Sequence, residues 1–299
     1  MESIHRTVLL NETIDGLNLS PESIVLDCTF GGGGHSLEIC SRYPNVKIIA
    51  IDQDKSAWEK AKSKFNGCNC KVCFNNTNFG ELDKVLEKEE IEKVDGIIFD
   101  LGLSSDQLEN SGRGFSFMKN EPLLMTMKEN PDLEDLTARD IVNNWEEKNL
   151  ADIIYGYGEE KFSRKIAKAI VEARGKKEIN TTFELVEILE KVLPAGYKKG
   201  RLHFATKTFQ ALRIAVNDEL RILSTGLEKG LNVLKNKGRM SVISFHSLED
   251  RIVKRFYKEK EKEKKVFLIN KKIITASVEE LKNNPRSRSA KLRILEKIF

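Results

Sequence analysis

The chain has 299 residues, of which 40% are hydrophobic and 32% charged, and its formal net charge is +4. This length and composition support one large domain, or a domain with an insertion, that has a sizeable core and a heavily charged surface. No apolar run approaches the roughly 18 residues of a membrane-spanning helix, so we expect no membrane partner.

The five cysteines and the first residues bear on the compartment. The count is odd, and the amino terminus lacks the apolar stretch of a signal peptide. We therefore expect reduced thiols and a cytoplasmic protein. We expect no metal site, because Cys68, Cys70 and Cys73 lack a second cysteine pair or histidines nearby.

Strands and helices alternate over the first hundred residues, which predicts βαβ units and a parallel sheet. The predicted strands are Ile24–Phe30, Val46–Asp52, Cys70–Asn75 and Val94–Gly102. The helices predicted between them are Ser36–Arg42, Lys55–Asn66 and Gly80–Glu89.

Four glycines, Gly31–Gly34, follow the first predicted strand directly. Asp52 ends the second strand, 21 residues after Gly31. A glycine turn followed by an acid at this spacing is typical of a site for a nucleotide-like ligand, in which the acid accepts hydrogen bonds from the ribose hydroxyls. A dinucleotide and S-adenosylmethionine both fit, although a dinucleotide fingerprint would have glycine where Ser36 stands.

Three acids end predicted strands at the carboxyl edge: Asp27, Asp52 and Asp100. Charges there cost stability unless they are hydrated or paired, which favours a functional site. Capping of the next helix is the alternative for any one of them.

The pattern becomes helical from residue 108 to 205, which predicts an all-helical insertion. Its helices are expected at Asp135–Lys148, Lys161–Ala173 and Thr182–Val192. Within it, Arg113, Phe115 and Phe117 place a cation beside two aromatics, a group that can stack on a base. Aromatics that anchor the insertion are the alternative.

The last third returns to the main domain with a helical pattern over Phe209–Lys235 and a fifth strand over Arg239–Ser244. His246 follows that strand, either as a proton acceptor or base contact or as a structural histidine. Two basic segments, 251–265 and 286–297, favour a polyanion such as RNA over a merely solvated surface.

These motifs resemble one family over nearly the whole chain: the RsmH/MraW methyltransferases, which methylate cytosine N4 in bacterial small-subunit ribosomal RNA. The similar segments are Asp27–His35, Asp100–Ser105, Arg113–Phe117, Phe209–Leu220, Ser244–Arg251 and Asn284–Ala290. The resemblance implies a Rossmann-like class I methyltransferase domain (1–107 and 206–299) with a helical insertion for substrate recognition (108–205).

The resemblance also implies S-adenosylmethionine as donor and N4 of cytosine 1402 in 16S ribosomal RNA, within the small subunit, as acceptor. The implied donor contacts are Gly33, Gly34, His35, Asp52, Phe79, Asp100 and Gln107. The residues that we expect to act on the cytosine are Asp100, Ser104, Ser105 and His246. The residues that we expect to contact RNA are Arg113, Phe115, Phe117, Arg251, Lys254, Arg255, Arg286 and Arg288.

One segment departs from the family pattern Asp-Met-Arg-Met-Asp. Here it reads Leu124-Met125-Thr126-Met127-Lys128. We expect this change to affect acceptor handling, so that restoring the family residues raises turnover; apolar repacking of the loop is the alternative. Such a divergent copy is a methyltransferase with altered target or weak activity, or a non-catalytic RNA-binding assembly factor.

A nicotinamide-dependent oxidoreductase is the remaining rival, disfavoured by Ser36 in the glycine motif. The sequence leaves open whether the protein is a monomer or a homodimer.

Overall fold

The computed structural model describes residues 7–299, apart from the side chains of Ala57, Trp58 and Ser105. The chain forms two compact units. The sheet unit comprises Met1–Gly102 and Leu220–Phe299, and the helical unit comprises Leu103–Glu219. The units divide at 102/103 and 219/220, and α11 (Thr206–Asn217) packs Phe209 and Leu212 into the core of the helical unit. The domain limits expected at 107/108 and 205/206 stay a prediction.

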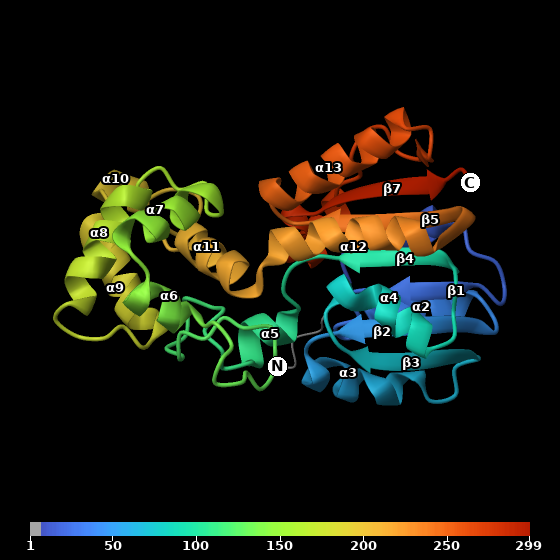
Figure 1. The fold of residues 1–299 in the computed structure, drawn as a ribbon, viewed down its shortest axis with the longest axis horizontal. Coiled ribbons are helices and arrows are strands. Elements are labelled where there is room, and N and C mark those ends of the chain that lie inside the picture. The colour runs from blue at the N-terminus through green and yellow to red at the C-terminus, as the bar shows by residue number, and fades with distance from the viewer. Residues whose placement is uncertain (1–6) are drawn as a thin grey trace. The chain divides into compact units, whose positions relative to one another are not determined.

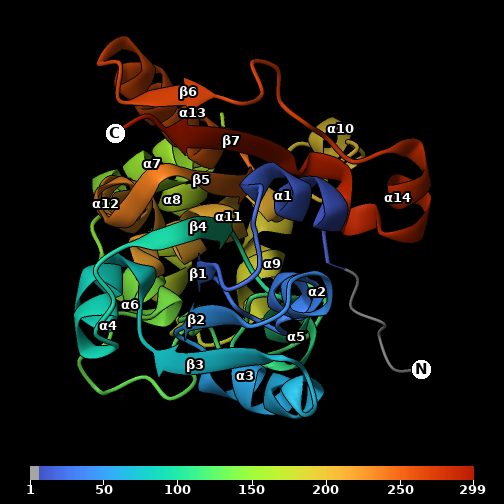
Figure 2. The same cartoon turned by 90° about the vertical axis from the view of Figure 1, so that its right-hand side faces the viewer.

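A seven-stranded sheet runs through the sheet unit in the order β3-β2-β1-β4-β5-β7-β6, which can be followed in Figure 2. Its strands are β1 (Ile24–Asp27), β2 (Val46–Asp52), β3 (Cys70–Asn76), β4 (Val94–Asp100), β5 (Leu234–Ser244), β6 (Val266–Leu268) and β7 (Lys291–Lys297). The pairs among β1 to β5 are parallel, and β7 is antiparallel to β5 and β6. This confirms the predicted α/β class with a mostly parallel sheet.

Alternate residues of the central strands enter cores on opposite faces of this sheet, because side chains alternate along a strand. Leu26 and Ile97 face one core, and Val25 and Ile98 face the other. The first core is covered by α4 (Leu82–Lys88), α12 (Glu219–Val233) and α13 (Ser247–Lys262). The second face carries α1 (Leu10–Leu17), α2 (Gly34–Arg42) and α3 (Lys55–Lys62). Figure 2 shows α1 and α2 on the side of the sheet opposite α4 and α12.

The helical unit is built around its own apolar core. Its helices are α5 (Ser105–Asn110), α6 (Ala138–Asn144), α7 (Glu147–Gly156), α8 (Ser163–Arg174), α9 (Thr182–Val192), α10 (Ala195–Lys198) and α11, labelled in Figure 1. Its described residues include no strand, only an isolated bridge between Pro122 and Thr181. No helix in the described part of the chain is both long and apolar enough to span a bilayer.

Several predicted elements differ from the observed ones. The single helix expected over Phe209–Lys235 is two helices, because Asp218 takes a left-handed conformation with φ 49°. Strand β7 is an element that the sequence did not predict, because cations stand between the buried residues Leu292 and Ile294 and give the segment the composition of a basic surface. Four short elements complete the sheet unit: η1 (Ser63–Phe65), η2 (Phe79–Glu81), α14 (Val278–Asn283) and η3 (Pro285–Ser289).

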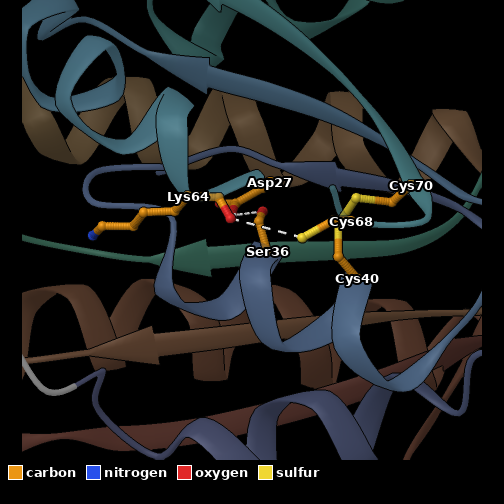
Figure 3. The surroundings of a disulfide bond; sticks show 6 residues. All are labelled: Asp27, Ser36, Cys40, Lys64, Cys68 and Cys70. Atoms are coloured by element: carbon orange, nitrogen blue, oxygen red, sulfur yellow. Dashed lines mark hydrogen bonds between the residues drawn. A yellow bond between two sulfur atoms is a disulfide. The ribbon is translucent and has the colours of Figure 1, made fainter. Parts of the chain in front are cut away.

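The expectation that all thiols are reduced is wrong in this structure. Cys40 of α2 and Cys70 of β3 form a disulfide, with their Cα atoms 5.5 Å apart, as Figure 3 shows. An odd number of cysteines leaves pairs free to form, and the fold brings these two within the usual Cα separation for a bridge. Cys28, Cys68 and Cys73 are free thiols.

Candidate active site

A sharp turn of glycines joins β1 to α2. Gly31 and Gly33 have positive φ angles of 49° and 73°, a region that glycine enters without the steric penalty of a Cβ. A Cβ on Gly33 would lie 2.7 Å from the Phe30 ring, whereas one on Gly32 would meet no atom within 4 Å. The main chain at Gly32 therefore borders open space, where a ligand can approach closely.

Asp52 ends β2 and holds this turn in place. Its Oδ2 accepts a hydrogen bond from the Gly31 N–H at 2.6 Å, and its Oδ1 accepts one from the Asp54 N–H at 2.8 Å. Burial raises the pKa of the Asp52 carboxyl to about 6, while the two backbone hydrogen bonds oppose that rise. Because each carboxylate oxygen has two lone pairs, Asp52 keeps acceptors for the hydroxyls of a sugar.

Asp27 ends β1 and ties three parts of the site together. Its Oδ2 accepts from the Ser36 hydroxyl of α2 at 2.6 Å, and its Oδ1 accepts from the Thr29 N–H at 3.2 Å. Thr29 Oγ1 in turn accepts from the Asp100 N–H at 2.6 Å. Burial raises the pKa of Asp27 to about 6, and the Ser36 bond opposes this. The network fixes the first turn of α2 against the ends of β1 and β4.

Asp100 ends β4 with one oxygen unpaired. Its Oδ1 is buried and has no hydrogen-bond partner among the described residues, and its Oδ2 lies 3.8 Å from His35 Nδ1. His35 is itself buried, with Nε2 3.2 Å from the Val8 carbonyl oxygen. Burial, followed by the charges of Asp27 and Glu249, raises the pKa of Asp100 to about 8. Buried polar atoms are normally bonded, so the Oδ1 atom indicates a place for a ligand's donor group.

His246 begins α13 and is paired within its own turn. Its Nδ1 accepts from the Glu249 N–H at 3.4 Å, and Glu249 Oε2 accepts from the N–H groups of Phe245 and His246 at 2.8 and 3.2 Å. His246 Nε2 lies 3.2 Å from Glu249 Oε1 without an aligned hydrogen bond. This arrangement gives His246 a helix-capping role, and its contact with a substrate stays a prediction.

Phe79 lies in η2, after β3, and is half-buried. Its ring packs edge-on against Phe99, with centroids 5.4 Å apart, and lies 2.8 Å from where a Cβ on Gly226 would be. Gly226 of α12 thus makes room for this ring. The expected contact of Phe79 with a ligand stays a prediction.

Gln107, Ser104 and Ser105 belong to the helical unit. Ser104 Oγ accepts from the Gln107 N–H at 3.1 Å, and Gln107 Oε1 accepts from the Ser104 N–H at 3.0 Å, which forms the capping box of α5. The side chain of Ser105 lies outside the described part of the structure. The donor contact of Gln107 and the catalytic contacts of Ser104 and Ser105 stay predictions.

The cation and aromatics of the loop that follows α5 mostly serve packing. Arg113 is buried and donates from Nη1 to the carbonyl oxygens of Met127 and Lys128 at 2.9 and 2.8 Å. Phe115 is buried in the core of the helical unit. These two side chains favour the structural alternative over base stacking, because neither offers an exposed face.

Phe117 differs from its neighbours because it is only half-buried. One face of its ring stacks on His203, with centroids 4.4 Å apart and an interplanar angle of 7°. Contact of Phe117 with RNA therefore stays a prediction.

The loop that departs from the family pattern is held by hydrogen bonds and burial in place of the family's charges. Asn217 Nδ2 donates to the Met125 carbonyl at 2.8 Å, and its Oδ1 accepts from the Met127 N–H at 2.8 Å. Thr126 is buried, at 5% exposure. Lys128 Nζ lies 2.7 Å from both carboxylate oxygens of Asp135. These contacts favour the repacking alternative.

The five basic side chains of the sheet unit that we expect to contact RNA are all exposed, on α13 and η3: Arg251, Lys254, Arg255, Arg286 and Arg288. The cations of β7 serve the fold: Arg293 Nε lies 2.8 Å from Asp250 Oδ1, and Lys297 Nζ donates to the Leu234 carbonyl at 2.8 Å. Contact of the exposed five with RNA stays a prediction.

Two buried acids of the site had partners that sequence reasoning missed. Glu249 stands three residues after His246, which is the spacing of a capping box, but histidine is not a usual capping residue. The bond between Asp27 and Ser36 had no signal in the pattern beyond the position of Asp27 at a strand end.

The chain is similar to known proteins over almost its whole length. The profile of the MraW methylase family matches residues 2–298. Two curated proteins of Clostridium botulinum, from strains Kyoto (type A2) and 657 (type Ba4), are each 48% identical to this chain over 100% of both chains. Both are named ribosomal RNA small subunit methyltransferase H. Among solved structures, an rRNA methylase from Streptococcus thermophilus is similar with a TM-score of 0.46 and 13% identity, covering 99% of each chain.

Proposed function

The chain belongs to the MraW methylase family, and from this premise we propose that it methylates small-subunit ribosomal RNA. The methyl group passes from S-adenosylmethionine to the exocyclic N4 of cytosine 1402 in 16S ribosomal RNA, in the cytoplasm. The observation that carries the proposal is the 48% identity, over the full length of both chains, to relatives named for this small-subunit activity.

The glycine turn and Asp52 fit the donor. The open space at Gly32 admits the amino acid part of the donor against bare main chain, and Asp52 has lone pairs left for ribose hydroxyls. The donor, when bound, would supply a methyl group on a sulfonium that an amino nitrogen can attack in line at the methyl carbon, with the sulfur leaving as a thioether. Gly33, Gly34 and His35 line this turn, and Ser36 and Asp27 hold α2 in position beneath it.

Asp100 fits the acceptor. The amino nitrogen of cytosine is conjugated with the ring and is a weak nucleophile. A carboxylate that accepts one of its N–H bonds draws the lone pair out of conjugation and stabilises the charge that develops on methyl transfer. The unpaired Oδ1 of Asp100 is such an acceptor when the carboxyl is ionised. Because the pKa of Asp100 is about 8, the ionised form is the minor one at neutral pH and grows as the pH rises towards 8. The cytosine must leave its stack to reach a site of this kind.

Methylation of small subunits that lack the mark tests this proposal. The protein is incubated with such subunits and donor that carries a labelled methyl group, and label in the RNA is measured. We expect incorporation by the wild type and a fall of about a hundredfold or more in Asp100→Asn, the scale for removing one electrostatic interaction with the transition state.

Calorimetry with S-adenosylhomocysteine then separates donor binding from acceptor chemistry in the same variant. Donor binding without any RNA methylation by the wild type would favour the RNA-binding assembly factor. Full activity of Asp100→Asn would remove Asp100 from the mechanism.

A further inference from the structure

The disulfide fastens the helix that follows the glycine turn. Ser36 and Cys40 lie one turn apart on α2, and both are buried. Ser36 donates to Asp27 of β1, and Cys40 is bonded to Cys70 at the start of β3. Figure 3 shows these two attachments side by side on the same helix. The helix is therefore held to the sheet at two points, of which only one is covalent.

The segment on the other side of the disulfide also packs on the glycine turn. Lys64 Nζ donates to the Gly32 carbonyl at 3.3 Å, and the Phe65 ring lies 3.1 Å from where a Cβ on Gly33 would be. Cys68 donates from Sγ to the Lys64 carbonyl at 3.7 Å. The turn thus lies between α2 and residues 64–70, and the disulfide closes the ring that these pieces form.

We propose that Cys40 and Cys70 are a reversible thiol–disulfide couple whose oxidised form holds the donor site ready to bind. The inference rests on the proposed function for the identity of the donor. Disulfides in the reducing cytosol are usually transient and serve redox sensing or catalysis. A bridge placed around the glycine turn couples the thiol redox state to the affinity for the donor.

The chemistry of the couple is ordinary thiol–disulfide exchange with small thiols. A thiolate of a dithiol reductant attacks one sulfur of the Cys40–Cys70 bond, and the electron pair of that bond leaves on the other sulfur, which takes a proton. The second thiol of the reductant then resolves the mixed disulfide. The protein gains two electrons and two protons, and the dithiol becomes a disulfide. A small disulfide drives the reverse reaction.

The other thiols are poorer candidates for this exchange. Burial raises the pKa of the Cys28 thiol well above its usual range. Burial, together with Glu89, also raises the pKa of Cys73. A raised pKa lowers the thiolate fraction that exchange requires. Cys68 is half-buried and donates from Sγ to the Lys64 carbonyl instead of pairing with another cysteine.

Linkage sets the size of the expected effect. If the bridge preorganises the turn, reduction should weaken donor affinity by about tenfold, within the common range for coupled sites. The coupling is reciprocal, so saturating donor should lower the reduction potential of the couple by about 30 mV, which is the tenfold ratio converted for a two-electron couple. If the disulfide only adds stability, its reduction potential should be the same with and without the donor.

The test uses the full-length protein equilibrated in dithiothreitol redox buffers. Alkylation and mass spectrometry give the fraction of Cys40–Cys70 at each potential, with and without S-adenosylhomocysteine. Calorimetry gives the affinity of the oxidised and reduced wild type for the same ligand. We expect the tenfold weakening on reduction and the matching shift in potential.

Two variants complete the design. Cys40→Ser removes the only cysteine of α2 and should bind like the reduced wild type at every potential. Cys73→Ser changes a free thiol on the same strand as Cys70, and its affinity for the ligand should fall on reduction as in the wild type. The wild-type comparison needs no substitution, so a Cys40→Ser that fails to fold leaves the test intact.

Equal affinity of the oxidised and reduced wild type, or no bridge at any potential, would overturn the inference. Failure of the oxidised protein to bind the ligand at all would instead count against the proposed donor.

Discussion

The loop over Leu124–Lys128 gives the sharpest prediction about this chain's own branch of the family. The change restores the family pattern with Leu124→Asp, Thr126→Arg and Lys128→Asp. The sequence alone favoured a gain in turnover. The hydrogen bonds and burial of the loop favour the opposite result, a fall in stability without a gain in methylation.

The magnitude follows from the surroundings of each position. Lys128→Asp removes an ion pair with Asp135 whose side chains are 47% and 26% exposed, worth about 0.2–1 kcal/mol, and sets two acids together. Thr126→Arg forces a large cation into a position of 5% exposure, and overpacking alone costs about 1–3 kcal/mol. Leu124→Asp adds up to about 1 kcal/mol through reduced apolar burial.

These contributions sum to roughly 1–5 kcal/mol of unfolding free energy, and about 2–4 °C accompanies each kcal/mol in a protein of this size class. We therefore expect the melting temperature to fall by roughly 2–20 °C, measured by circular dichroism. Methylation of small subunits is measured on the same preparations, at a temperature where the variant is folded.

A charge swap provides the matched control. Lys128→Asp combined with Asp135→Lys keeps one ion pair in reversed order and should recover most of the stability that Lys128→Asp alone removes. An unchanged melting temperature in the triple variant, together with faster methylation, would refute the repacking account.

Three further predictions concern the donor site, the acid at its edge and the basic surface. Asp52→Ala should weaken S-adenosylhomocysteine binding by roughly 1.5–3 kcal/mol, the scale of hydrogen bonds to a charged group; unchanged affinity in calorimetry would exclude Asp52 from the donor site. The pKa of Asp100 in the folded protein, about 8, lies above its unfolded value, so the stability it contributes is full below about pH 4 and is lost as the pH rises towards 8. Asp100→Asn should flatten this fall in pH-dependent unfolding, and an unaltered profile would show that Asp100 is ionised at neutral pH. Replacing basic side chains that bind RNA should lower the slope of log affinity against log salt by about 0.7–0.9 for each phosphate that is no longer neutralised, and an identical slope would mean that these cations are only solvated. The variant for this measurement changes four exposed cations to Gln: Lys254, Arg255, Arg286 and Arg288.

The sheet and the position of the glycine turn could be predicted because local pattern determines them. The strand that ends in Asp52 has its predicted limits in the structure, since its apolar run is bounded on both sides. The same reasoning did not predict β7. Its buried Leu292 and Ile294 alternate with cations, and the cations indicated an RNA-binding surface more strongly than the alternation indicated a strand. In this segment the same residues form both the basic run and the alternating pattern of a strand. Only the folded structure shows that Arg293 pairs with Asp250 and does not face solvent as a free cation.

The contacts between residues far apart in the sequence could not be predicted, because they depend on how distant segments pack together. Cys40 and Cys70 are 30 residues apart, and nothing in their spacing marks them as a pair. Arg113 and Phe115 looked like a stacking group, yet long-range packing of the helical unit buries both. Composition shows which side chains can stack on a base, but only tertiary structure shows which of them have a free face.

The central claim is tested most directly by mapping N4-methylcytidine in 16S ribosomal RNA after incubation of unmethylated small subunits with this protein and S-adenosylmethionine. Nuclease fragments analysed by mass spectrometry should carry a single new methyl group, on N4 of cytosine 1402, only when both protein and donor are present. A methyl group on another nucleotide, or none with a protein that binds the donor, would contradict the account.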